Sequence, residues 1–115
     1  MDELDVNDIP AMLARLQAQA QEEAVEFTLH AQQEMAEEDI RPDDVLAVLA
    51  SGQILENYPD HRRGACCLVY GQTSEGRHLH LVCTTARPTV ILITAYEPLP
   101  PKWTTPTQRG PRDDL

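Results

Sequence analysis

The residues of this sequence whose chemistry stands out are Tyr70, His80 and Tyr96 in its second half. A histidine exchanges protons near neutral pH, and a tyrosine hydroxyl can pass on a proton or stabilise a developing charge. Arg62 and Arg63 precede Tyr70 and carry guanidinium groups, which bind phosphate well. This combination fits metal-independent cleavage of RNA, in which the 2′-hydroxyl attacks the adjacent phosphate. The alternative is that the aromatic residues are ordinary strand residues, since aromatic side chains favour strands.

Two further residues allow more than one interpretation. His30 falls in a predicted helix and could reach the same face as His80 to assist the reaction, or it could bond a backbone carbonyl as a structural histidine. Trp103 lies among prolines and beside Lys102, where it can act as a packing anchor or as a platform for stacking bases.

The three cysteines, Cys66, Cys67 and Cys83, could suggest a metal site. The first two are adjacent and lack the two-residue spacer of a zinc knuckle, and strand alternation points them in opposite directions. We therefore predict no metal and no cofactor, with Cys67 and Cys83 buried as reduced thiols near one another. Reduced thiols fit a cytoplasmic location.

The net charge is −10, from nineteen Asp and Glu against nine Lys and Arg. Such a surface disfavours non-specific binding to nucleic acid. The charge is uneven, because residues 1–60 hold fifteen of the acidic residues but only two of the basic ones. Any contact with RNA is therefore expected in the second half. No apolar run is long enough to predict a membrane span, and the acidic start does not fit a signal peptide, so we expect a soluble cytoplasmic protein.

The first half of the sequence predicts helices. Asn7 or Asp8 can cap a helix that ends near residue 21, Thr28 can cap a second helix to residue 38, and Pro42 starts a third that Gly52 ends. Residues 24–27 contain β-forming residues and are expected to be a short extended lead-in to the second helix.

The second half predicts four strands, at residues 54–58, 65–72, 78–85 and 89–96, separated by turn-forming residues. We therefore expect an α+β fold in which two or three N-terminal helices pack on one face of a four-stranded antiparallel sheet. Residues 1–103 would form a single domain with an N-terminal helical segment at 1–22. An extended arm would dock as far as Trp103, and residues 104–115 would form a flexible tail.

The turn lengths predict a register for the sheet. Tyr70 should lie opposite His80 and Cys67 opposite Cys83, because antiparallel partners keep a constant sum of residue numbers. A second turn with an even sum would place His80 opposite Thr94 and His78 opposite Tyr96. Odd-numbered residues would then face the helices. Even-numbered residues would form the other face, polar at one end and apolar at the other, which suggests a covering helix or a partner protein.

The order of residues adds a resemblance to a known family. The stretches TLHAQQEM from Thr28, SGQILENYP ending at Pro59, RRGACCLVYG from Arg62, GRHLHLVC from Gly76 and ILITAYEPLPPKW ending at Trp103 together resemble the bacterial family called domain of unknown function 4258. The resemblance covers residues 27–103. That family is similar to the RelE-like and MqsR-like toxins, which are small mRNA endoribonucleases.

The resemblance implies a RelE-like fold and the toxin half of a type II toxin–antitoxin pair, with a zinc-finger-type antitoxin as partner. It implies Arg62 and Arg63 on phosphate and His80 as general acid or base, with Tyr96, Tyr70 or His30 assisting. Many members carry Arg where this chain has Glu34 and Glu38, and these reversals weaken any contact between the second helix and RNA. The alternative function is a non-catalytic module of the same fold that binds a partner protein through the sheet face. The candidate partners are thus the antitoxin, RNA and a second copy of the chain in a homodimer.

Overall fold

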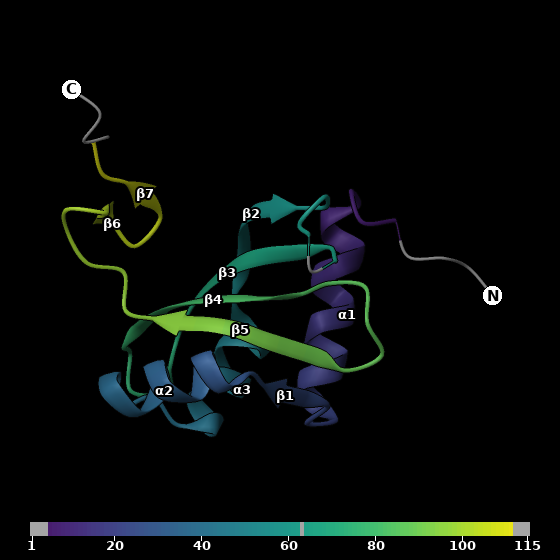
Figure 1. The fold of residues 1–115 in the computed structure, drawn as a ribbon, viewed down its shortest axis with the longest axis horizontal. Helices are drawn as coiled ribbons and strands as arrows, with labels where there is room; N and C mark the ends of the chain where they lie inside the picture. Colours follow the sequence, from purple (N-terminus) through teal and green to yellow (C-terminus); the bar gives the residue numbers. More distant parts are fainter. Residues whose placement is uncertain (1–4, 63, 112–115) are drawn as a thin grey trace.

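A computed structural model describes residues 5–62 and 64–111, which form an α+β fold of three helices, a five-stranded sheet and a small hairpin (Figure 1). The elements in chain order are α1 (Ile9–Gln21), β1 (Val25–Phe27), α2 (Leu29–Glu38), α3 (Pro42–Ser51), β2 (Gln53–Tyr58), β3 (Cys66–Gln72), β4 (His78–Thr84), β5 (Val90–Tyr96), β6 (Trp103–Thr105) and β7 (Gln108–Arg109).

The helices begin where the sequence predicts, because the capping side chains make the expected bonds. The Asp8 carboxylate accepts a hydrogen bond from the backbone N–H of Ala11 at 3.1 Å, and the Thr28 hydroxyl accepts one from Ala31 at 3.1 Å. Asp44 caps the start of α3 by accepting from the N–H of Arg41 at 2.9 Å.

The main sheet has the strand order β1-β5-β4-β3-β2, so the prediction of four antiparallel strands is wrong. The expected lead-in before α2 is a fifth strand, β1, which runs parallel to β5 and pairs Val25 with Val90 and Phe27 with Leu92. The sheet is therefore mixed. A local pattern could not reveal this pairing, because β1 is only three residues long and its partner lies far away in the sequence.

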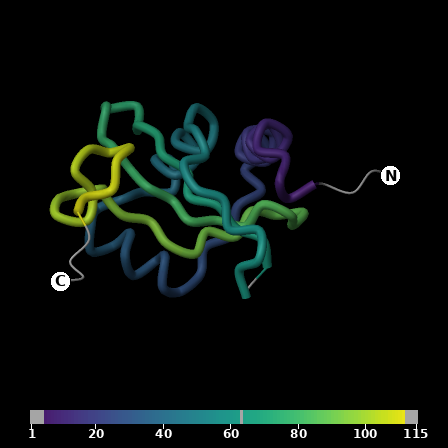
Figure 2. Tube along the Cα trace, turned by 90° about the horizontal axis from the view of Figure 1, so that it is seen from above, coloured from purple at the N-terminus to yellow at the C-terminus, as the bar shows by residue number. Residues whose placement is uncertain are grey.

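One core joins the helices to the sheet. Helix α3 packs against α1 and β3, and α2 packs along β5 (Figures 1 and 2). The core includes Leu16 of α1, Met35 of α2 and Leu49 of α3, which meet the buried side chains of β3, β4 and β5. Because the helices cover one face of the sheet, the opposite face is left for other contacts.

The predicted register of β3 and β4 is confirmed. Tyr70 lies opposite His80, and Cys67 lies opposite Cys83. Both of these cysteines are fully buried, and they form no disulfide bond with each other. A hydrogen bond with Cys67, together with burial, raises the pKa of Cys83 well above its ordinary value, so this thiol stays protonated.

Replacing Cys83 by alanine should lower the free energy of unfolding by about 1–2 kcal/mol, because a fully buried side chain is shortened and leaves a small cavity. Urea denaturation followed by circular dichroism would measure the loss. A stability equal to that of the wild type would contradict this packing role.

The predicted register of β4 and β5 is wrong by one residue next to the turn that joins them and by two residues beyond a bulge. Val82 pairs with Thr94 but Cys83 pairs with Leu92, so Ile93 is the extra residue in β5. His80 consequently lies opposite Tyr96 rather than Thr94. The bulge also reverses the alternation, since Leu92 is buried in the core while Ile93 is only half-buried.

The chain after β5 forms more ordered structure than the sequence suggests. Trp103 is buried, as an anchored arm requires, at 2% exposure. The chain then continues into the β6–β7 hairpin, which pairs Trp103 with Arg109, where the sequence predicts a tail from residue 104. Residues 112–115 of that tail lie outside the described residues.

Candidate functional site

Three neighbouring strands bring the predicted site residues Tyr70, His80 and Tyr96 together. His80, in the middle strand β4, has Tyr70 of β3 on one side and Tyr96 of β5 on the other. The His80 ring centroid lies 6.0 Å from that of Tyr70 and 5.2 Å from that of Tyr96, both in edge arrangements. All three belong to the face turned away from the core, because their neighbours Leu79, Leu81 and Ala95 are core residues.

Both ring nitrogens of His80 are hydrogen-bonded. Nε2 lies 2.6 Å from the backbone carbonyl of Pro106, and Nδ1 lies 3.1 Å from the hydroxyl of Tyr96. A carbonyl can only accept, so Nε2–H is the donor; in the neutral ring Nδ1 then accepts from the Tyr96 hydroxyl. This assignment follows from the partners and fixes the tautomer of His80.

Burial sets the protonation of this pair. It lowers the pKa of His80 below its ordinary value, because a charged imidazolium loses hydration in the interior, and it raises the pKa of Tyr96. His80 has no exposed surface. The closed site therefore holds a neutral histidine and a protonated tyrosine at cellular pH, and it lies out of reach of a substrate.

A second histidine–tyrosine pair lies beside the first. The Tyr70 hydroxyl is 2.7 Å from Nδ1 of His78, and the two rings are stacked with centroids 5.8 Å apart. His78 and Tyr70 are half-buried, so this pair is more accessible than fully buried His80 at the same end of the sheet. His78 was not among the predicted site residues, although its two-residue spacing from His80 is the signal that they share a strand face.

An ion pair that sequence reasoning missed closes the site from the side of β2. Both carboxylate oxygens of Glu56 accept from the guanidinium of Arg109, at 2.7 Å each, and the Tyr58 hydroxyl also donates to Glu56. The hydrogen bond from Arg109 lowers the pKa of Glu56, and burial is the main cause that raises the pKa of Tyr58 to about 12. Glu56 and Arg109 are 53 residues apart in the sequence and carry no spacing signal.

The Glu56–Arg109 pair should make stability depend on acid pH. Because the folded pKa of Glu56 is depressed below its ordinary value of 4.5, its contribution is full above that value and is lost as the pH falls through the lower folded pKa. Thermal unfolding from pH 7 to pH 3 should therefore show the wild type lose more stability than a Glu56→Gln variant. Parallel curves for the two proteins would contradict the ion pair.

The arm that follows β5 supplies the groups that cover His80. The Trp103 ring meets the His80 ring edge-on at a centroid distance of 4.3 Å. The Arg109 guanidinium lies 4.7 Å from the Trp103 ring centroid, and the Lys102 ammonium lies 5.6 Å from that of Tyr96. In both views the hairpin lies at the opposite end of the molecule from α1 (Figures 1 and 2).

The structure does not bring the other predicted residues to this site. His30 lies on α2 with 64% of its side chain exposed, and its Nε2 is 3.4 Å from Glu34. Arg62 is exposed in the turn that precedes β3, whereas Tyr70 lies near the other end of that strand. Tyr70 lies four positions along the strand from Cys66, which is roughly 13 Å of chain. Arg63 lies outside the described residues.

Glu34 and Glu38 of α2 have a structural role in this chain. Glu34 accepts from the backbone N–H of Ala95 at 3.0 Å, and Glu38 accepts from that of Glu97 at 2.9 Å. The N–H groups lie at the end of β5 and directly after it, past the part of this edge that pairs with the short strand β1. The two carboxylates thus complete the bonding of this edge, which an Arg side chain, having no acceptor, cannot do.

Replacing Glu34 by alanine should lower the free energy of unfolding by about 1–2 kcal/mol, because the N–H of fully buried Ala95 loses its acceptor. Glu34→Gln is the matched control, since its amide oxygen can still accept. Denaturant unfolding of the two variants would compare them. Equal losses of unfolding free energy in the two variants would show that the acceptor oxygen of residue 34 does not contribute to stability.

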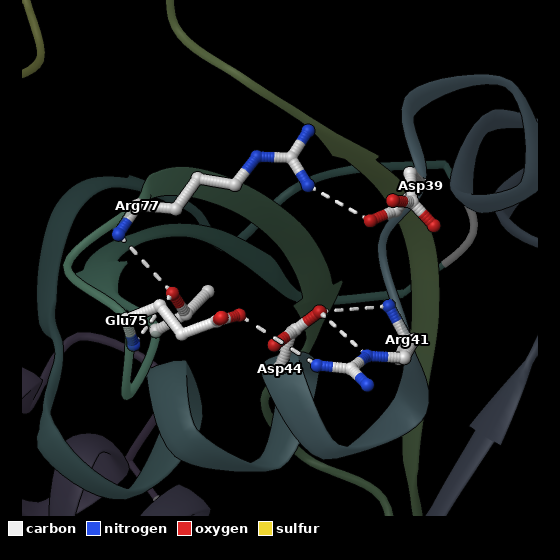
Figure 3. A pocket seen from close by; sticks show the side chains of 6 residues that line it. Asp39, Arg41, Asp44, Glu75 and Arg77 are labelled. Carbon is white, nitrogen blue, oxygen red and sulfur yellow. Dashed lines mark hydrogen bonds and ion pairs between the residues drawn. The ribbon is translucent and has the colours of Figure 1, made fainter.

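A separate polar pocket of about 270 Å³ lies where the start of α3 meets the turn between β3 and β4 (Figure 3). Arg41 reaches Glu75 at 3.6 Å, and Arg77 binds Glu97 at 2.7 Å and the backbone carbonyls of Glu38 and Asp39. The Arg77 contacts neutralise the negative end of the α2 dipole. Since both guanidinium groups have protein partners, they tie elements together rather than offering a phosphate site.

Searching residues 5–62 and 64–111 for metal ligands finds no group of three or more His, Cys, Asp or Glu side chains arranged to hold an ion. Within the same residues, no helix has both the length and the apolar character that crossing a lipid bilayer requires.

The fold and site together define an α+β protein whose mixed sheet carries a histidine–tyrosine centre beneath its own C-terminal hairpin. The chain belongs to the family described as "Domain of unknown function (DUF4258)", which matches residues 27–97. The match contains Tyr70, His80 and Tyr96 but ends before Trp103. No curated protein and no solved structure shows significant similarity to the chain.

Proposed function

We propose that this protein is a metal-independent endoribonuclease of the type found in type II toxin–antitoxin pairs, with a RelE-like fold. The observation that carries the proposal is the contact between His80 Nδ1 and the Tyr96 hydroxyl at 3.1 Å, on one sheet face with the Tyr70–His78 pair. Such an arrangement supplies a proton carrier, a group that orients it and further hydroxyl donors. The family resemblance supports the same reaction.

In the proposed reaction His80 moves the proton. Its Nε2, which now faces the Pro106 carbonyl, is the nitrogen that would face RNA once that carbonyl leaves. Contact with water would return the pKa of His80 toward its ordinary value of 6.5, where the ring can both take and give a proton. In the open site the neutral ring carries its proton on Nδ1, hydrogen-bonded to the Tyr96 hydroxyl oxygen, so that Nε2 takes the proton of the 2′-hydroxyl. The 2′-oxygen bonds to phosphorus, giving a 2′,3′-cyclic phosphate. The P–O5′ bond breaks, and the leaving oxygen takes the proton from Nε2.

The other residues have supporting roles in this proposal. Tyr96 orients His80 through Nδ1, and Tyr70 with His78 offers hydroxyl and imidazole donors to the charged phosphate. Arg62, which precedes β3, and its sequence neighbour Arg63 would hold the RNA backbone rather than act at the bond that is cleaved. His30, which is exposed on α2, has no part in the reaction.

The test is cleavage of a labelled single-stranded RNA by the purified protein in the presence of a metal chelator. We expect products with 2′,3′-cyclic phosphate ends and, on expression in bacteria, growth arrest with mRNA cleavage. An antitoxin encoded beside the protein should prevent both. Intact RNA after incubation with the wild type and with the variants that expose His80, described below, would overturn the proposal.

One observation favours a second function, which is binding of a partner protein without catalysis. An apolar groove of about 290 Å³ lies over the start of β5 and is lined by Thr28, Thr84, Arg87, Ile91 and Ile93. Leu29 beside it is 71% exposed. The net charge of −10 also suits a protein partner better than RNA. The test is an Ile93→Asp variant. This function is favoured if the variant no longer binds a zinc-finger-type antitoxin, or a second copy in a homodimer, and if no variant of the protein cleaves RNA.

A further inference from the structure

The covering of His80 is made by one short segment of chain. The segment comprises residues 102–110, which hold β6, β7 and the turn between them. It places the Trp103 ring and the Pro106 carbonyl directly on the His80 ring, at 4.3 Å and 2.6 Å. We call residues 102–110 the C-terminal lid.

The C-terminal lid is built as a unit separate from the domain. Its two strands pair with each other and do not join the main sheet. Gly110 donates to the carbonyl of Lys102 at 2.7 Å, which closes the hairpin on itself. Trp103 is its one buried side chain, and this ring is not part of the cluster that the helices form with the sheet. Removing the lid would therefore leave that core intact.

A small number of contacts hold the C-terminal lid shut. Besides Trp103 and the Pro106 carbonyl, Arg109 bridges the Glu56 carboxylate, which belongs to β2. The side chains of this bridge are 51% and 27% exposed, so water and salt reach it. After Trp103, the residues of the two strands and of the turn between them are exposed, except for half-buried Pro106. Segments with few buried contacts are the ones that open locally, without global unfolding.

We propose that the C-terminal lid is an autoinhibitory cover, which opens as one body while the helices and main sheet stay folded and thereby admits RNA to His80. This inference rests on the proposed nuclease function for the identity of what enters. The covered residues lie within the family match at 27–97, whereas the lid follows it, so the site and its cover are distinct parts of the chain. Closure keeps the proposed centre out of contact with RNA until the lid moves.

The experiment uses the full chain and its single tryptophan, which lies in the C-terminal lid. Arg109→Ala removes the bridge to Glu56 and the cation over Trp103. We expect it to raise the open fraction about fivefold, and with it acrylamide quenching of Trp103 and carbethoxylation of His80 by diethyl pyrocarbonate. Modification is mapped by mass spectrometry, with exposed His30 as the internal reference.

Arg41→Ala is the matched control, because the Arg41 side chain is also largely exposed and forms ion pairs, with Glu75 and Asp44, but Arg41 precedes α3 on the face of the sheet opposite to the C-terminal lid. It should leave quenching and His80 modification unchanged. A second lid variant, Gly110→Ala, acts through the backbone, since a Cβ at residue 110 would lie 1.8 Å from the carbonyl oxygen of Pro101. It should expose Trp103 and His80 as Arg109→Ala does. Unchanged far-UV circular dichroism shows that the domain remains folded.

In the wild type, urea should raise Trp103 quenching at concentrations below those that change the circular dichroism signal. The proposed lid is overturned if Trp103 quenching and the circular dichroism signal change at the same urea concentration and neither lid variant gains Trp103 quenching or His80 modification. If both variants expose His80 and cleave RNA about fivefold faster than the wild type, the lid and the nuclease are both supported. If both expose His80 and neither cleaves RNA, the lid stands and the proposed nuclease function falls.

Discussion

A His80→Ala variant should cleave RNA about 10²-fold more slowly than the wild type, or worse, because it removes the group that is proposed to carry the proton. The loss should appear in the rate of the chemical step under single-turnover conditions rather than in the affinity for RNA. Both ring nitrogens of His80 bond within the site, and neither is placed to bind RNA away from the cleaved bond. Tyr96→Phe, which removes the hydroxyl partner of Nδ1 but keeps the ring, should give a smaller loss and an altered pH profile.

His30→Ala is the control for this prediction. His30 is exposed on α2 and contacts Glu34, so its loss should leave the cleavage rate unchanged. Because His80 is fully buried, circular dichroism and a denaturation curve must show that the His80→Ala variant is folded. Wild-type rates in a folded His80→Ala variant would remove His80 from the mechanism.

The largest loss of stability is expected from Gly52→Ala, at about 3 kcal/mol. Gly52 follows α3 at the point where this helix meets β3. A Cβ there would lie 2.5 Å from the carbonyl oxygens of both Tyr70 and Val48, which are backbone atoms and cannot turn aside as a flexible side chain would. The backbone dihedral of Gly52 is extended, so the requirement for glycine comes from this close approach alone.

Gly76→Ala provides the contrast. Gly76 has a φ of +83° and no atom within 4 Å of an added Cβ, so alanine there meets strain but no collision. Its cost should be about 1–2 kcal/mol. Urea unfolding of both variants would compare them. If Gly52→Ala were no more destabilising than Gly76→Ala, the contact between α3 and β3 would be looser than the structure indicates.

The local elements could be predicted because their signals lie within a few residues. Asp8 and Thr28 mark helix starts because their side chains accept from N–H groups three residues further on, and Pro42 marks one through its fixed φ. Alternation of residue type marks the four longer strands. The pairing of Tyr70 with His80 also followed, since a short turn fixes the register of the strands it joins. The family resemblance and the match agree over residues 27–97.

The bulge at Ile93 was not predictable from alternation, and it changed the composition of the site. The sequence around it reads as a continuous apolar strand, so nothing in residue type marks the extra residue. The turn before β5 shifts the register by one residue from the prediction and the bulge by one more, and together they place Tyr96, instead of Thr94, opposite His80. Similarly, β1 pairs in parallel with β5, from which it is separated by α2, α3 and three strands, so no short turn fixes this pairing.

The sequence by itself determined the α+β class, the buried cysteines and a histidine flanked by tyrosine on one strand face, because these depend on residue type and on neighbours joined by short turns. Only the tertiary structure decided that His80 is closed in. Its cover depends on Glu56 meeting Arg109 and on the Pro106 carbonyl meeting His80, contacts between segments 53 and 26 residues apart. Contacts over such separations are set by how the whole chain packs, and no local periodicity encodes them.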